Sequence, residues 1–331
     1  MTQKQSLPAP RMLVLLCTHQ GERYLPLQLR SLVEQTFAPE AVVVHDWGST
    51  DGTRSLLHEF AFAMANRFAV HIVQHEQAPG PCASFLRALD QVLEEHEPFD
   101  LLLPCDQDDL WHPDKLRRIA VAWTAQPDTD LLYSDVRLVD AQGRVLTPSY
   151  IGGKGALARR QDINHVSSLF VNVVPAMAMA LSRRFLIAHR EAWRQPGWVM
   201  HDWAWIIVAH LTGALVLQLP EALVDYRQHA SNFVGGQTPT AHCYAAPTLR
   251  ATWLQARHRV TAIHAQYRQC AALPQRYLRW PLSRCAVLWI VLSGRHFNAW
   301  RTFKVALGLA LLWPGRDCPE TGRSEQRCTR S

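Results

Sequence analysis

The first 135 residues alternate short, continuous apolar runs with longer amphipathic segments, and this alternation constrains the fold more than any other feature of the chain. The runs have the length of strands, and the longer segments space their apolar residues as helices do. Strands are expected over residues 12–17, 41–46, 70–74, 101–105 and 130–134. Helices are expected over residues 23–35, 54–66, 83–95 and 113–125. Because the strands show no alternation of apolar and polar residues, helices must cover both faces of the sheet. The pattern predicts an α/β fold, doubly wound around a mostly parallel, Rossmann-like sheet.

Polar residues gather where three of these strands end, at residues 18–21, 46–51 and 106–109. In doubly wound sheets, ligands bind beyond the carboxyl ends of the strands. One such cluster is typical of an ordinary turn, but three at one sheet edge indicate a cleft.

The following hundred residues are less regular. A hairpin is expected over residues 136–146, with its turn at 140–143, and a Gly-rich loop over 152–162 is a candidate mobile lid. Further strands are expected over 176–181, 214–219 and 222–226, and a helix over 201–211.

The last part of the chain has a different charge and hydropathy. Residues 245–331 hold 14 of the 34 basic residues but only 3 of the 28 acidic ones. Residues 282–293 and 299–313 are apolar segments of helical length, shorter than the roughly 20 residues that a spanning helix needs. With Arg295, Arg301 and Lys304 close by, they indicate a helical extension at an anionic membrane surface. A helical subdomain packed on the sheet, or a dimer contact, is the open alternative. Nucleic-acid binding is not expected, because the arginines are spread between the apolar helices.

The termini and the cysteines bear on the cell compartment. Residues 1–10 are polar and rich in proline, so no cleaved signal peptide is expected and the protein is predicted to be cytoplasmic. The eight cysteines form no C-x-x-C pair, which favours reduced, mostly buried thiols over a zinc site or a disulfide framework.

The stretch "LLLPCDQDDLWHPDK" is the most informative in the chain. It places Asp106, Asp108 and Asp109 directly after an apolar strand. Three carboxylates this close repel one another unless a cation neutralises them. Mg²⁺ or Mn²⁺ suits such a site, because these ions take one or two protein carboxylates and complete their shell with water and substrate phosphate.

Several motifs together resemble those of family 2 glycosyltransferases of the GT-A fold, and more narrowly the bacterial rhamnosyltransferase-like members that build cell-surface polysaccharides. The matching stretches are "CTHQGERYLPLQLRSLVEQTF", "HDWGSTDGT", "CDQDDLWHPDK", "MHDWAW" and "DYRQHASN". The resemblance runs from about residue 12 to 236. It implies a transferase domain over residues 1–240, with a nucleotide-sugar half at about 12–135 and an acceptor half at about 136–240. Residues 241–315 would form the helical extension and residues 316–331 a disordered tail.

The resemblance also implies roles for individual residues. Asp106 would lie by the donor ribose, Asp108 would bind the metal at the diphosphate, and Asp202 would be the general base of an inverting transfer. Arg227 and His229 would face the diphosphate or the metal, with His229 as a second metal ligand. The remaining donor-side residues would be Thr18, His19, Asp46, Trp47, Ser49 and Asp51. Further substrate contacts would come from Trp111, Lys115, His201 and Trp203.

The chain departs from the family pattern on the side that binds the donor base. Trp47 replaces the second of two adjacent aspartates, and His19 and Gln20 replace a tyrosine and an asparagine. An indole nitrogen only donates a hydrogen bond, so Trp47 cannot accept the imide proton of a pyrimidine, although its ring can stack on a base. Catalysis is therefore expected to be kept, while the identity of the base stays open.

The leading hypothesis is transfer of a sugar, such as rhamnose, from a dTDP- or UDP-sugar to a glycan or polyprenyl-linked acceptor on the inner face of the plasma membrane. Two alternatives stay open. A sugar nucleotidyltransferase usually begins with a Gly-rich loop bearing Arg and Lys, which "CTHQGERY" lacks. A catalytically degenerate glycan-binding or scaffold protein is suggested by Trp47.

Overall fold

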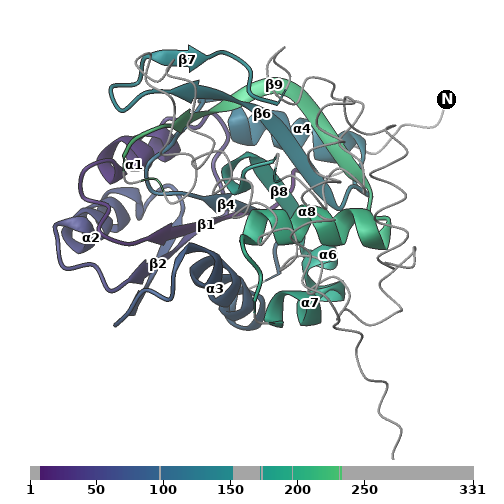
Figure 1. Cartoon of the computed structure of the whole chain (residues 1–331), viewed down its shortest axis with the longest axis horizontal. Helices are drawn as coiled ribbons and strands as arrows, with labels where there is room; N and C mark the ends of the chain where they lie inside the picture. Colours follow the sequence, from purple (N-terminus) through teal and green to yellow (C-terminus); the bar gives the residue numbers. More distant parts are fainter. Residues whose placement is uncertain are drawn as a thin grey trace, which may run out of the picture.

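The computed structural model describes residues 8–96, 98–151, 172, 174–195, 197–230 and 232. The predicted lid loop at 152–162 and all predictions for residues beyond 232 lie outside the described residues. Within them, the chain folds around a single sheet with the strand order β3-β2-β1-β4-β8-β6-β9-β5, and β7 pairs with β6 (Figure 1).

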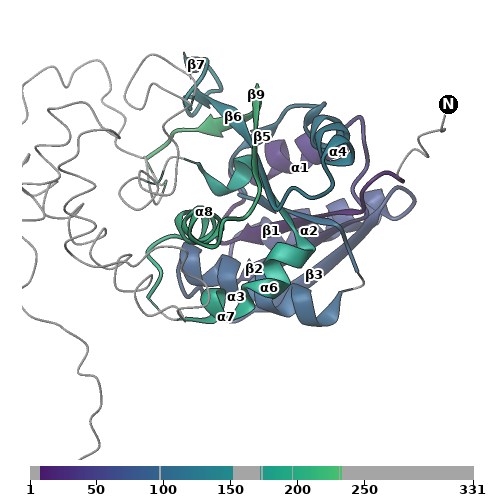
Figure 2. The ribbon, with the colours of Figure 1, turned by 90° about the vertical axis from the view of Figure 1, so that its right-hand side faces the viewer.

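The N-terminal half of the sheet is parallel and confirms the prediction. Its strands, in spatial order, are β3 (Ala69–His75), β2 (Ala41–Trp47), β1 (Met12–Thr18) and β4 (Leu101–Cys105). The intervening helices are α1 (Leu25–Val33), α2 (Thr53–Met64) and α3 (Pro81–Glu95). Figure 2 shows α1 and α4 (Lys115–Ala125) on one side of the sheet and α3 and α7 (Arg190–Arg194) on the other. The strand ends of this half therefore meet at one edge, as the doubly wound fold requires.

The second half of the sheet is mixed. Strand β8 (Met179–Ser182) runs antiparallel to both β4 and β6 (Leu131–Val139), while β9 (Val216–Arg227) is parallel to β6. The predicted hairpin is confirmed by β6 and β7 (Val145–Thr147). A short strand, β5 (Leu110–Trp111), pairs with β9 and was not predicted.

Several expected elements have different bounds. The two strands expected over 214–226 form one long strand, β9, whose pairing with β6 is irregular on either side of Asp135. The strand expected over 176–181 begins as a 3₁₀ turn, η2 (Ala176–Ala178), before β8. Helices α6 (Arg183–Ala188) and α7 were not predicted, because they are too short to show a clear periodicity.

The join between the two halves is short. Strand β4 pairs with β8 only through Leu101 and Leu102, and the same register would place Leu103 opposite Ala180 and then Pro104 opposite Met179. Proline has no N–H to donate to a neighbouring strand. Pro104 therefore cannot extend the pairing by donating a hydrogen bond to β8.

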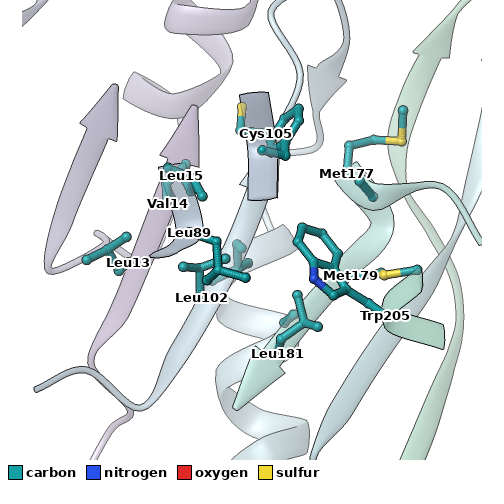
Figure 3. Packing of buried hydrophobic residues seen from close by; sticks show 14 of the residues in the cluster. Leu13, Val14, Leu15, Leu89, Leu102, Cys105, Met177, Met179, Leu181 and Trp205 are labelled. Carbon is teal, nitrogen blue, oxygen red and sulfur yellow. The ribbon is translucent and has the colours of Figure 1, made fainter. Parts of the chain in front are cut away.

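The core is continuous across both halves. Strands β1, β2 and β4 are buried along their whole length, and helix α8 (His201–Thr212) is buried on nearly every side. Gly213, with φ +68°, ends α8 in the left-handed conformation that favours glycine. Figure 3 shows part of this apolar cluster, which includes Leu13, Val14 and Leu15 of β1, Leu89 of α3, Leu102 of β4, Leu181 of β8 and Trp205 of α8.

Two observations bear on the compartment. Cys17, Cys82 and Cys105 are free thiols, and two of them are buried, which agrees with the expectation for these three. No helix of the described residues is both long enough and apolar enough to cross a bilayer.

Candidate active site

A cavity of about 410 Å³ lies where the carboxyl ends of β1, β2 and β4 meet the start of α8. The structure brings seven of the predicted site residues to its wall: Thr18, His19, Trp47, Asp106, Asp108, His201 and Asp202. The nucleotide-side and acceptor-side motifs, far apart in the sequence, therefore face one space.

The acidic loop after β4 supplies one wall. Burial, together with the charges of Asp108 and Asp202, raises the pKa of Asp106 to about 8. Burial, together with the charges of Asp108 and Asp106, holds the pKa of Asp109 well above its usual range. The loop thus holds more carboxylates than it can ionise at neutral pH without a cation.

Asp108 meets a residue from the other half of the sheet. Its Oδ2 lies 2.8 Å from Nε2 of His229, which follows β9 and does not itself line the cavity. The imidazole stacks on Tyr24, with ring centroids 4.5 Å apart. A carboxylate and an imidazole fit a divalent ion such as Mn²⁺ that takes its other ligands from substrate and water. No group of three or more His, Cys, Asp or Glu side chains in the described part of the chain could hold an ion alone.

Asp202 supplies the opposite wall. It lies in the first turn of α8, where the positive end of the helix dipole favours an ionised carboxylate. Its Oδ1 accepts hydrogen bonds from the backbone N–H of Trp203 at 2.7 Å and from Nδ2 of Asn172 at 2.9 Å. Burial outweighs these bonds and raises the pKa of Asp202 to about 6. A carboxylate with this pKa suits general-base work near neutral pH.

Hydrogen bonds to the buried side chain of Asp46 hold the turn after β2 in place. Asp46 is fully buried and accepts hydrogen bonds from Oγ1 of Thr18 at 3.0 Å and from Nε of Arg54 at 2.9 Å. At Gly48, with φ +72°, a Cβ atom would lie 2.5 Å from the carbonyl oxygen of Glu76, so a side chain does not fit. The turn residues thus shape the rim of the cavity from outside it.

Three residues predicted to touch the donor are placed behind the cavity wall. Asp46 uses its carboxylate on Thr18 and Arg54, while Ser49 and Asp51 donate to or accept from neighbouring turn and loop residues. None of the three lines the cavity. The structure assigns them to support of the turn.

Trp47 does reach the cavity, although only 4% of its surface is exposed. One ring face is covered by His75, with the two rings nearly parallel and their centroids 3.7 Å apart. The backbone carbonyl of Trp47 lies 2.7 Å from Nδ1 of His19. With one face covered and 4% of the residue exposed, only a small part of the indole is available to a base.

Arg227 corrects a second expectation. Its side chain is 2% exposed and does not line the cavity. Its backbone N–H donates to Oδ1 of Asp109 at 2.9 Å, and its Nε donates to the carbonyl of Asp108 at 2.9 Å. The guanidinium therefore ties β9 to the acidic loop and lies outside the cavity lining.

Three predicted substrate contacts also lie in the protein interior. Lys115 is fully buried, donates from Nζ to the carbonyl of Met177 at 2.7 Å, and lies 4.2 Å from the ring centre of Trp111. Trp111 and Trp203 are buried as well, and none of the three lines the cavity. The ring of Trp111 and the carbonyl of Met177 thus stabilise this lysine in the interior.

Sequence reasoning missed several wall residues. The cavity is also lined by Phe85, Tyr150, Asn172, Met177, Tyr226 and Asn232. Asn232 ends the stretch "DYRQHASN" and could have been included, since its side-chain oxygen accepts from the N–H of His229 at 3.1 Å. Asn172 lies in no recognisable pattern and reaches Asp202 only through the fold.

Comparison with known proteins supports a family for the first half of this site. Residues 13–169 match the family model described as glycosyl transferase family 2. The match supports a family 2 glycosyltransferase domain over those residues. The chain is therefore a glycosyltransferase, as its motifs predicted.

Relatives of this glycosyltransferase agree with that assignment. It is 22% identical over 227 residues to the dTDP-rhamnosyl transferase RfbG of Shigella flexneri, which covers 66% of this chain and 73% of that protein. Among solved structures, it is similar to S. aureus TarS 1–349 in complex with UDP-GlcNAc, with a TM-score of 0.57, 18% identity, and coverage of 92% of this chain and 78% of that one. It is also similar to the mannosyltransferase PcManGT from Pyrobaculum calidifontis in complex with GDP-Man and Mn²⁺, with a TM-score of 0.52, 18% identity, and coverage of 95% and 78%. The GT-A fold of the glycosyltransferase is thereby confirmed.

Proposed function

We propose that this glycosyltransferase moves a sugar from a nucleoside-diphosphate sugar to an acceptor hydroxyl by a metal-dependent, inverting mechanism. The observation that carries the proposal is the meeting of Asp106, Asp108 and Asp202 around one cavity, from two separate parts of the sequence. One wall has the charge to hold a cation with a diphosphate. The other has a carboxylate suited to remove a proton.

In the proposed reaction, Asp202 takes the proton of the acceptor hydroxyl. The hydroxyl oxygen attacks the anomeric carbon on the face opposite the nucleotide, and a new C–O bond forms. The bond from the anomeric carbon to the phosphate oxygen breaks, and its electron pair leaves with the nucleoside diphosphate. Attack from the opposite face inverts the anomeric configuration.

Asp108 and His229 would hold the divalent cation, since they approach within 2.8 Å and provide oxygen and nitrogen ligands. When bound, such an ion offsets the negative charge that develops on the leaving diphosphate. Mg²⁺ or Mn²⁺ is the proposed ion; the imidazole favours Mn²⁺, since Mg²⁺ prefers oxygen ligands, and PcManGT was solved with Mn²⁺.

A dTDP- or UDP-sugar is the favoured donor, and rhamnose the favoured sugar. Support comes from the similarity to dTDP-rhamnosyl transferase RfbG and to TarS with UDP-GlcNAc. Thr18, His19 and Trp47, which line the nucleotide-side wall, would receive the base and ribose together with Asp106.

The acceptor is proposed to be a glycan or polyprenyl-linked sugar at the cytoplasmic face of the plasma membrane. This rests on the basic, apolar segments within residues 241–315. The proposed domain division is 1–240 for the transferase, 241–315 for the membrane contact and 316–331 for the tail.

Calorimetric titration tests the proposal. Purified protein is titrated with dTDP-, UDP- and GDP-sugars, each with Mn²⁺ and with a chelator, alongside Asp108→Ala. Asp114→Ala is the matched control, since Asp114 pairs with Arg117 and does not line the cavity. Metal-dependent binding of one nucleotide, lost only in Asp108→Ala, is expected.

The two alternatives give different results. If the folded protein binds no nucleotide sugar but binds glycans, the scaffold hypothesis replaces the proposal. If it condenses a nucleoside triphosphate with a sugar 1-phosphate and releases pyrophosphate, it is a nucleotidyltransferase.

A further inference from the structure

His201 is a buried polar side chain in the cavity wall with no visible partner. It precedes Asp202 at the start of α8, and only 3% of its surface is exposed. Its ring stacks on Phe85, with centroids 4.1 Å apart, and meets the edge of Trp205 at 5.0 Å. Neither Nδ1 nor Nε2 has a hydrogen-bond partner among the described residues.

Such a side chain is unusual, because buried polar groups in folded proteins are nearly always hydrogen-bonded. Packing alone does not explain a histidine here, since a phenylalanine would stack on Phe85 without leaving unsatisfied nitrogens. The ring lines the cavity, so the missing partner is expected to be a bound molecule.

The surroundings define the chemistry of that molecule. Burial lowers the pKa of His201 to about 3, so the imidazole is neutral, with one nitrogen donating and the other accepting. A hydroxyl group can serve both nitrogens, whereas an ionised phosphate can only accept. Asp202 is adjacent, and no lysine or arginine lines the cavity within the described residues, so an anionic group beside His201, away from the proposed cation site, would be repelled.

The neighbouring wall is apolar. Phe85, Ala176, Met177 and Met200 line the same cavity as His201. Apolar surface beside a donor–acceptor pair suits an uncharged sugar, whose hydroxyls point outward from a C–H face.

We propose that His201 is a specificity-determining residue that binds hydroxyl groups of a sugar in the reaction. The proposal rests on the proposed function and adds a sugar subsite between α3 and the start of α8. The sugar is either the one transferred or the one that accepts it, and the two are separated by experiment.

The test compares His201→Phe with His201→Gln. Phenylalanine keeps the ring on Phe85 but removes both nitrogens, while glutamine restores a donor and an acceptor. His189→Phe is the matched control, because His189 also packs on a phenylalanine, Phe185, but does not line the cavity. Thermal unfolding verifies that each variant is folded.

Affinities are measured in Mn²⁺ for dTDP against dTDP-rhamnose and for UDP against UDP-GlcNAc. If the transferred sugar is the ligand, His201→Phe binds the nucleotide sugar about tenfold or more weakly but binds the free nucleotide normally. His201→Gln recovers part of the loss. If the accepting sugar is the ligand, donor affinity is unchanged and KM for the acceptor rises by a similar factor.

Two further outcomes are distinct. In the first, the wild-type protein binds these donors and His201→Phe has the same donor affinity and the same KM for the acceptor. This result would overturn the subsite and leave the proposed function intact. Wild-type protein that binds neither nucleotide nor nucleotide sugar would overturn the proposed function and the subsite together.

Discussion

Asp106 and Asp202 face the same cavity but take different roles because their surroundings differ. Asp202 keeps two hydrogen-bond donors and a helix N-terminus beside it, so its pKa rises only to about 6. Asp106 has two carboxylates as its main charged neighbours, and its pKa rises to about 8. The first is ionised at neutral pH without help, and the second is ionised when a cation is near.

This difference predicts the pH dependence of the reaction. A general base must be ionised, so kcat/KM is expected to fall about tenfold per pH unit below about pH 6. Asn172→Ala removes a bond that favours the ionised form, and the acidic limb should move to higher pH. Asp202→Asn should reduce kcat by about 10²–10⁴-fold. Steady-state rates from pH 5 to 8 would measure both, and a limb that stays in place in Asn172→Ala would contradict the assignment.

Lys115 gives a prediction about how the stability of the folded protein depends on pH. Burial lowers its pKa to about 7 in the folded protein, so between pH 7 and the usual lysine value the unfolded chain binds more protons. The free energy of unfolding contributed by this group should rise with pH across that window and be lost as pH falls through about 7. In Lys115→Met, denaturant titrations from pH 7 to 9.5 should lack this rise, by about 1 kcal/mol per pH unit. Parallel pH profiles for the two proteins would show that Lys115 is not buried as described.

Residue-level prediction from sequence succeeded where a motif encodes the contact and failed where burial decides it. Asp108 and His229 were both predicted as metal ligands from two motifs, and the structure places them 2.8 Å apart, while metal binding itself stays a prediction. Lys115 and Arg227 were expected at the site because the family resemblance implied a substrate contact for the first and a diphosphate or metal contact for the second. Both instead satisfy backbone carbonyls in the interior, and no sequence pattern distinguishes these two uses.

At the scale of elements, the acidic loop and the end of β9 form one unit. His229 contacts the side chain of Asp108, and Arg227 binds the carbonyl of Asp108 and the carboxylate of Asp109. A cation at Asp108 would therefore stabilise the contact between two elements that are 120 residues apart in sequence.

The unit predicts a pH-dependent effect of metal. Without a cation, the raised pKa of Asp106 makes the folded state bind a proton that the unfolded chain lacks, so stability falls as pH rises from about 4 to 8. Mn²⁺ should offset this fall and raise Tm more at pH 8 than at pH 6. Thermal unfolding with Mn²⁺ and with a chelator measures the difference. Asp108→Ala and His229→Ala should lose it, and an equal effect at both pH values would count against the site.

Elements were predictable to the extent that periodicity was clear. The parallel strands and their helices were found within a few residues, because long apolar faces dominate there. The reversal of β8 was not predicted, since a short apolar run carries no information about strand direction. The 3₁₀ turn at Ala176–Ala178 was also missed, because three residues are too few to show a periodicity, yet it lines the cavity.

At the scale of the molecule, the cavity is shared by a parallel half, which carries the acidic loop and the nucleotide-side turns, and a mixed half, which carries Asp202. The doubly wound class follows from the sequence alone, because alternating strands and helices permit few topologies. The pairing of the mixed half depends on contacts distant in sequence, such as β6 with β9, and could not be read from local pattern.

The whole-molecule prediction concerns membrane contact. Deleting residues 280–331 should abolish partition onto vesicles of anionic lipid, because both apolar segments and most nearby basic residues are removed. Sedimentation with anionic and with neutral vesicles measures the loss. The full chain with Arg295, Arg301 and Lys304 changed to Gln is the control for charge alone. Undiminished partition of the shortened chain would remove the membrane proposal.

Pro104 has a consequence for how such an enzyme diversifies. It has no N–H with which to extend the pairing of β4 with β8, and the two halves of the sheet are joined there through two residue pairs. The cavity is lined by residues of both halves. Side chains on either half of the sheet can then change, and with them the sugar or the base that binds. The paired residues that hold the two halves together stay the same.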